Sequence, residues 1–177
     1  MNTRKGEPVG KVSLEQIAQL EQNDNIIVED GGTIEVDVGS VSNTITIEGN
    51  GADGFVGSIV ISTASTLSGK ITLTNDSTIV SNKATIFDVS SGDAIDGSGT
   101  LTLNSSAGSM TIEDNINLSS GDLKKINVND VTLKGVNSYT GQTIITNSGS
   151  LNVLGSLPDS TNVAVGSGGT YNVNASD

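Results

Sequence analysis

The sequence predicts an all-β protein that folds as a parallel β-helix, a β-solenoid of stacked turns of chain, and three observations support this fold class. Gly, Ser, Thr and Asn make up nearly half of the 177 residues, and Ile and Val greatly outnumber Ala, a composition that favours strands and turns. From residue 25 onward, short apolar runs with a period of two alternate with Gly, Asn, Asp and Ser. Towards the C-terminus, apolar positions recur every 20 residues. A chain of this length fits a single domain.

Residues 1–24 differ from the rest of the chain. Ser13 and Gln16 have the spacing of a capping box at the start of a helix. The apolar residues that follow recur at intervals of three: Leu14, Ile17 and Leu20. We therefore expect a helix of about two to three turns, which either caps the first rung of the solenoid or serves as a linker. Residues 25–177 are predicted to form the solenoid.

The predicted strands have three to six residues, with no helix between them. They are 25–28, 33–38, 44–47, 58–61, 70–73, 85–87, 100–103, 110–112 and 125–128. Their Ile, Val and Leu side chains are expected to face the core, and their Thr, Ser and Asn side chains to face water. Residues 49–54 and 90–99 are rich in Gly, Ser and Asp and are predicted to bulge out as loops.

The 20-residue spacing distinguishes a solenoid from a sandwich of the same short strands. Two alternating apolar positions recur together, in the sets Leu133, Val153 and Val173, and Val131, Leu151 and Tyr171. A second strand family, Ile144–Ile145, returns 20 residues later as Ala164–Val165. A repeat of this length with two or more short strands describes one rung of a parallel β-helix. The chain then has roughly seven or eight rungs and a length of about 35 Å, at about 4.8 Å per rung.

Residues 131–174 carry a more specific pattern: a Leu-x-Gly-x-Asn-x-Tyr-x-Gly-x-Thr core, then a Gly-x-Leu strand and a Leu-Pro segment. This pattern resembles the passenger-associated transport repeat of bacterial autotransporters. The matching positions are Leu133, Gly135, Asn137, Tyr139, Gly141, Thr143, Gly149, Leu151, Val153, Leu157, Pro158 and Val173.

The resemblance implies a right-handed β-helical passenger segment of an autotransporter, on the surface of a Gram-negative cell or secreted from it. It further implies a non-enzymatic adhesin or virulence-type stalk whose repeat supports passenger folding and secretion, with a host-cell surface, matrix protein or glycan as partner. The alternative is a carbohydrate-binding or carbohydrate-active β-helix protein. The N-terminus lacks the apolar run of a signal peptide, so we expect the chain to be a segment of a larger exported protein.

Charge and missing residue types exclude several functions. The chain has 8 basic and 20 acidic residues, a net charge of −12, which disfavours nucleic acid and anionic membrane surfaces as partners. It has no His and no Cys, which excludes catalysis and metal binding by these residues, and disulfides. No stretch is long and apolar enough to insert into a membrane, and no cofactor is expected. Unpaired strand edges at the rod ends are expected to favour self-association.

Two acidic loops are candidate cation sites. Residues 48–56 partly match the calcium-binding nonapeptide repeat, but only one copy is present, whereas calcium binding there needs several stacked copies. Asp88, Asp93 and Asp96 form a second cluster whose spacing fits no calcium loop. We expect a Gly-rich loop and a solvated acidic loop rather than metal sites.

Catalytic candidates are few, and we expect no enzyme activity. A glycosidase needs two carboxylates on one face, for which Glu35, Asp37 and Glu48 are the candidates. A polysaccharide lyase typically needs a basic residue, but Arg4 lies outside the repeats and the lysines are scattered: Lys70, Lys83, Lys124, Lys125 and Lys134. Tyr139 could stack on a sugar, although its place in the repeat favours packing at a corner. Tyr171 is predicted to face the core.

Overall fold

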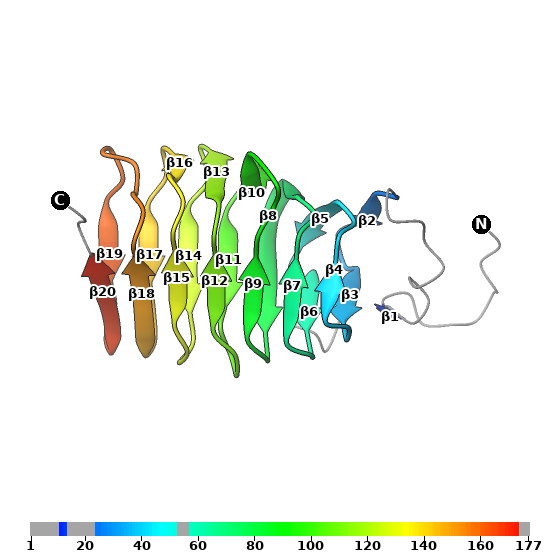
Figure 1. The fold of residues 1–177 in the computed structure, drawn as a ribbon. Helices are drawn as coiled ribbons and strands as arrows, with labels where there is room; N and C mark the ends of the chain where they lie inside the picture. Colours follow the sequence, from blue (N-terminus) through cyan, green and yellow to red (C-terminus); the bar gives the residue numbers. More distant parts are fainter. Residues whose placement is uncertain (1–10, 14–23, 53–56, 174–177) are drawn as a thin grey trace.

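The computed structural model describes residues 11–13, 24–52 and 57–173. These form twenty strands that pair in parallel, stacked along a rod that the chain ascends from end to end (Figure 1). No helix occurs in the described part of the chain. The predicted fold class, a parallel β-solenoid, is therefore confirmed. The solenoid has about seven turns, which agrees with the seven strands in the smaller of its two sheets.

Three stacks of strands run along the rod. The first contains β2 (Ile26–Val28), β5 (Ile45–Gly49), the start of β8 (Ile71–Ser81), β10 (Asp93–Gly97), β13 (Asn115–Ser119) and β16 (Ser138–Tyr139). The second contains β1 (Lys11–Ser13), β3 (Thr33–Val36), β6 (Ile59–Ile61), the end of β8, β11 (Leu101–Asn104), β14 (Leu123–Ile126), β17 (Thr143–Ile145) and β19 (Val163–Val165). The third contains β4 (Ser40–Val41), β7 (Ser65–Leu67), β9 (Thr85–Phe87), β12 (Met110–Ile112), β15 (Val131–Leu133), β18 (Gly149–Val153) and β20 (Gly169–Val173).

The register confirms the 20-residue repeat in the last rungs. Leu133 pairs with Val153, and Val153 with Val173, while the neighbouring column joins Val131, Leu151 and Tyr171. In the second stack, Ile145 pairs with Val165. Earlier rungs are less regular, since Ile34 pairs with Ile59, 25 residues on, and Ile79 with Leu103, 24 residues on.

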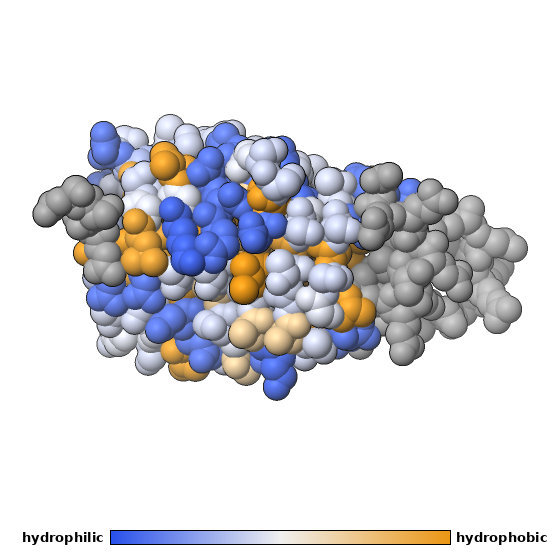
Figure 2. Space-filling view, viewed as in Figure 1, coloured by the Kyte–Doolittle hydropathy of each residue, from blue (hydrophilic) through white to orange (hydrophobic). Residues whose placement is uncertain are grey.

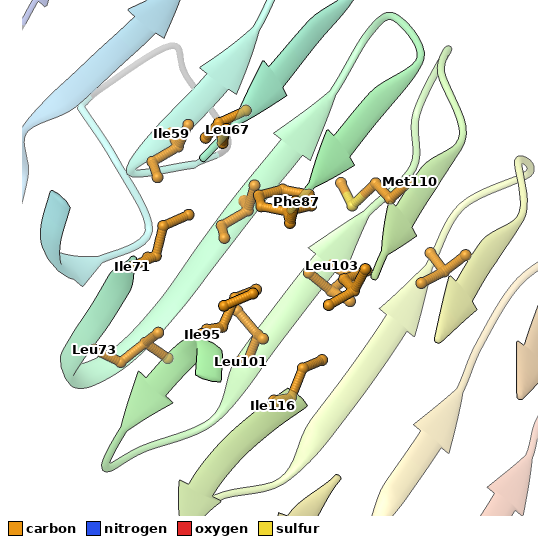
Figure 3. Close-up of a cluster of buried hydrophobic side chains, with 14 of the residues drawn as sticks. Ile59, Leu67, Ile71, Leu73, Phe87, Ile95, Leu101, Leu103, Met110 and Ile116 are labelled. Atoms are coloured by element: carbon orange, nitrogen blue, oxygen red, sulfur yellow. The ribbon is translucent and has the colours of Figure 1, made fainter. Parts of the chain in front are cut away.

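The core is a continuous column of aliphatic side chains between the three stacks (Figure 3). Ile59, Ile71, Ile95 and Leu101 are fully buried, and Phe87 adds one ring at 1% exposure. Stacked β-branched side chains pack well against identical neighbours on the pleated surface, which explains the excess of Ile and Val.

Two local predictions were wrong. Residues 90–99 are not an outward loop, because they contain β10, whose Ala94 and Ile95 are buried. The strand predicted at 125–128 is β14, which begins and ends two residues earlier. Pairing with the rungs before and after makes Leu123 and Lys125 the inward residues of this strand. The predicted strand begins at Lys125 and therefore leaves out Leu123.

The predicted N-terminal helix lies mostly outside the described residues, which omit 14–23. Ser13, its expected N-cap, is the last residue of β1. β1 pairs with β3, so the second stack includes Lys11–Ser13 as well as strands after residue 24.

Candidate functional site

The residues of the proposed repeat lie mostly inside the solenoid. Leu133, Thr143 and Leu151 are fully buried, and Val153 is 1% exposed. Leu157 is partly buried and packs against the core. Val173, by contrast, is 55% exposed, because it occupies the inward column at the last described rung.

Asn137 ties three rungs together. Its Oδ1 accepts a hydrogen bond from the backbone N–H of Ile116 at 3.0 Å, one rung earlier. Its Nδ2 donates to the carbonyl of Gly135 at 3.1 Å and to the carbonyl of Ser156 at 2.7 Å, one rung later. The side chain is 4% exposed, so all three bonds are shielded from water.

Tyr139 points into the core rather than outward. It is 2% exposed, and its hydroxyl lies 2.6 Å from Oγ1 of Thr143. Oγ1 of Thr143 lies 3.3 Å from that of Thr161, which donates to the carbonyl of Gly141 at 2.8 Å. Burial raises the pKa of Tyr139 to about 12. Tyr139 therefore offers no exposed ring to a sugar.

Two glycines of the repeat stand where rungs touch. A Cβ on Gly135 would lie 2.3 Å from the carbonyl carbon of Asp114, and one on Gly141 would lie 2.2 Å from the carbonyl oxygen of Gly121. Any side chain at either position would force the backbones of successive rungs apart.

Lys125 is the one charged residue buried in the core of the described chain. It occupies an inward position in register with Leu103 on one side and Ile145 on the other. Its Nζ donates to the carbonyl of Asn127 and, at 2.8 Å, to that of Ser148 on the next rung. Desolvation lowers the pKa of Lys125, and the nearby Asp130 carboxylate partly opposes this effect.

Sequence reasoning grouped Lys125 with the scattered lysines and missed its burial. The 20-residue spacing could have indicated this burial, because Lys125 precedes Ile145, an apolar residue of the next rung, by 20 residues.

A shallow groove of about 440 Å³ lies on the outer side of the first stack. Its lining comes from β8, β10, β13 and the residues that follow them: Leu73, Thr74, Asp96, Gly97, Ser98, Asn117 and Ser119. Only Asp96 was among the predicted candidates. The others are ordinary strand residues in the sequence, and the groove exists because three rungs meet.

The predicted cation ligands are not assembled. Among the described residues, no group of three or more Asp or Glu side chains could hold a metal ion. Asp96 pairs with Lys70 and accepts from Oγ1 of Thr72 at 2.7 Å, while Asp88 is exposed. Of the calcium-like segment 48–56, residues 53–56 lie outside the described part.

The three acids considered as glycosidase candidates lie on different strands or follow one. Glu35 lies on β3 in the second stack, and Glu48 lies on β5 in the first. Asp37 follows β3 and is exposed.

The surface in Figure 2 is mainly polar, with apolar residues scattered over it. The exposed large apolar residues include Ile27, Val128 and Val136, from different rungs. No helix in the described part of the chain has the length and apolar character needed to cross a membrane.

No protein-family model matches the chain, and no curated protein and no solved structure match it either. Residues and geometry therefore carry the functional argument.

Proposed function

We propose that this chain is a non-enzymatic stalk segment of an exported bacterial surface protein of the autotransporter-passenger kind. In this role the solenoid is a stiff spacer that exposes a long polar surface to a host cell, a matrix protein or a glycan. The repeat at 131–174 supports folding and secretion of the stalk. The molecule is displayed on the outer membrane of a Gram-negative cell or released from it.

One observation supports this proposal: the polar side chains of the motif form hydrogen bonds between successive rungs instead of lining a cleft. Asn137 joins its own rung to the rungs before and after it. Tyr139, Thr143 and Thr161 form a second internal chain of contacts between rungs. Buried polar networks of this kind are worth most when every member is satisfied, and they then favour one register. Hydrogen bonds that favour one register between rungs would help a segment that must fold without chaperones after export.

An export assay tests the folding role. The chain is fused between a signal peptide and a membrane-anchoring barrel, expressed in a Gram-negative host, and detected on the cell surface by antibody. Asn137→Asp keeps the size of the side chain but removes both donated hydrogen bonds, so surface display should fall. Asn152→Ala is the control, because the half-buried side chain of Asn152 accepts a hydrogen bond from Nδ2 of Asn172 on an outward position.

Unchanged display of Asn137→Asp, with a measured loss of stability, would refute the folding role. The adhesive role is tested separately with purified protein on immobilised host cells and matrix proteins. Saturable binding supports it, and no binding at micromolar concentration contradicts it.

The alternative function, carbohydrate binding, is favoured by a different observation, the groove on the first stack.

A further inference from the structure

Gly97 lines the groove at a point where two rungs lie close together. Gly97 has φ +128°, and a Cβ there would lie 2.1 Å from the carbonyl oxygen of Leu73. The neighbouring Ser98 donates its N–H to that same carbonyl at 3.2 Å. Any side chain at position 97 would therefore collide with the backbone of the preceding rung, so only glycine lets the two rungs lie this close at the groove.

A line of hydrogen-bonding side chains runs along the rod and includes Asp96, the residue before Gly97. In-register pairing places one such residue on each of five successive rungs: Thr46, Thr72, Asp96, Asn117 and Ser138. Successive strands of a sheet lie about 4.8 Å apart, so polar groups repeat at this interval. That interval is close to the length of one pyranose ring in an extended polysaccharide.

The groups at the centre of this line are held in place by their neighbours. Asp96 is fixed by Lys70 and by Oγ1 of Thr72. Nδ2 of Asn117 donates to Oδ2 of Asp93 at 3.4 Å. A carboxylate has about four acceptor sites and an amide has two acceptor lone pairs, so both retain capacity for a ligand. Fixed polar groups lose less entropy on binding than free ones.

We propose that the groove binds an uncharged polysaccharide whose chain runs parallel to the rod axis, with hydroxyl groups bonded to Asp96 and Asn117 and one ring over Gly97. A net charge of −12 disfavours anionic glycans. A peptide strand is disfavoured because the strands at the groove are already paired on both sides.

Binding is expected to be weak for a single site. The groove is shallow, and none of the described aromatic residues lines it, so hydrogen bonds supply the recognition. Such a site has a Kd of about 0.1–1 mM, and clustering of stalks on a surface would raise the effective affinity.

The test is an NMR titration of the full chain with neutral β-1,4-linked hexasaccharides of glucose, xylose and mannose, with hexagalacturonate as the anionic comparison. With at least one neutral sugar, we expect shifts confined to the amides around Thr74, Gly97 and Asn117. Asn117→Ala should weaken binding roughly threefold to tenfold, the equivalent of one lost hydrogen bond. Ser98→Trp should abolish binding by filling the groove.

Two matched variants control for general effects. Asn152→Ala removes a half-buried amide from the third stack, and Ser167→Trp adds the same bulky ring to an exposed turn; neither should change the Kd. The inference is overturned if no neutral sugar shifts these amides at millimolar concentration, or if the groove variants bind as tightly as the controls. This outcome is independent of the export assay, because export requires no ligand.

Discussion

Nζ of Lys125 donates a hydrogen bond to the backbone carbonyl of Ser148 at 2.8 Å, from a side chain with no exposed surface. The same amine also binds the carbonyl of Asn127 on its own rung. A lysine inside the core thus joins the corners of two successive rungs. Asn127 and Asn147, at these corners, both adopt positive φ, which Asn tolerates better than most residues.

Lys125→Met should lower the free energy of unfolding by about 1–3 kcal/mol at neutral pH, because two carbonyls lose their donor. The pKa of Lys125 is lower in the folded than in the unfolded chain, where it is near 10.5. Between these two values the unfolded chain binds more protons, so the wild type gains stability as pH rises. Urea denaturation from neutral pH to 10.5 should show this gain in the wild type and not in Lys125→Met. Lys124→Met, at an outward position, is the control, and equal pH slopes for all three proteins would contradict the prediction.

Tyr139→Phe should reduce the alkaline loss of stability. The Tyr139 hydroxyl keeps its proton up to a pKa of about 12 in the folded chain, against 10.0 for the unfolded group. Between pH 10 and pH 12 the unfolded chain therefore binds fewer protons, and the wild type should lose up to about 3 kcal/mol. The measurement is the difference in unfolding free energy between the two proteins across this range.

Tyr171→Phe is the control for Tyr139→Phe. Tyr171 is only partly buried, although its pKa is raised in the same direction. A difference that stays constant from pH 9 to pH 12 would show that Tyr139 does not titrate as its burial requires.

Asn137→Ala should lower the free energy of unfolding by about 2–4 kcal/mol. The buried N–H of Ile116 loses its acceptor, and the carbonyls of Gly135 and Ser156, which still accept from backbone N–H groups, each lose a second donor. Asn137→Asp should cost at least as much, since a carboxylate cannot donate to the carbonyls of Gly135 and Ser156. Asn152→Ala, at a half-buried outward position, should change stability by no more than about 0.5 kcal/mol. Equal urea midpoints for the Asn137 and Asn152 variants would contradict the assigned role.

Gly121→Ala should unfold the protein or destabilise it by more than about 3 kcal/mol, because the added Cβ would lie 1.7 Å from the carbonyl oxygen of Gly99. Gly39→Ala is the matched change, since nothing lies within 4 Å of its Cβ and its φ is not left-handed. It should be neutral or stabilise by up to about 1 kcal/mol. Thermal unfolding of the two variants compares them directly, and similar melting temperatures would show that the rungs are not in close contact at Gly121.

We expect the protein to associate through the open strand edges at the C-terminal end of the described rod. Among the described strands, β19 pairs only with β17, and β20 only with β18, which leaves one edge of each open. Neither strand carries a charged residue. We expect mass to rise with concentration in sedimentation experiments, and Val165→Lys or Val173→Lys to prevent this by placing a charge at the edge. Lys substitution at Val136, an exposed residue away from these edges, should leave association unchanged; a mass independent of concentration in the wild type would refute the prediction.

The prediction at 125–128 shows why some inward residues could not be assigned from the sequence. In this segment, apolar side chains occur at both odd-numbered and even-numbered positions, which point to opposite faces of a strand. Leu123 is on one face, and Ile126 and Val128 are on the other. A shift of one residue exchanges the two faces of a strand. Lys125 stacks in register between the inward residues Leu103 and Ile145, so the odd-numbered positions face the core and Lys125 is buried. Val128 is then 59% exposed.

The sequence by itself determined the all-β composition, the parallel stacking and the 20-residue register of the last rungs, because a regular repeat aligns equivalent residues without further information. Only the tertiary structure decided the groove and the Lys125 contact. Leu73, Gly97 and Ser119 stand 24 and 22 residues apart, and they meet only because rungs of unequal length are stacked in one register. Where the repeat is irregular, packing between rungs decides which side chains face inward and where the surface is hollow.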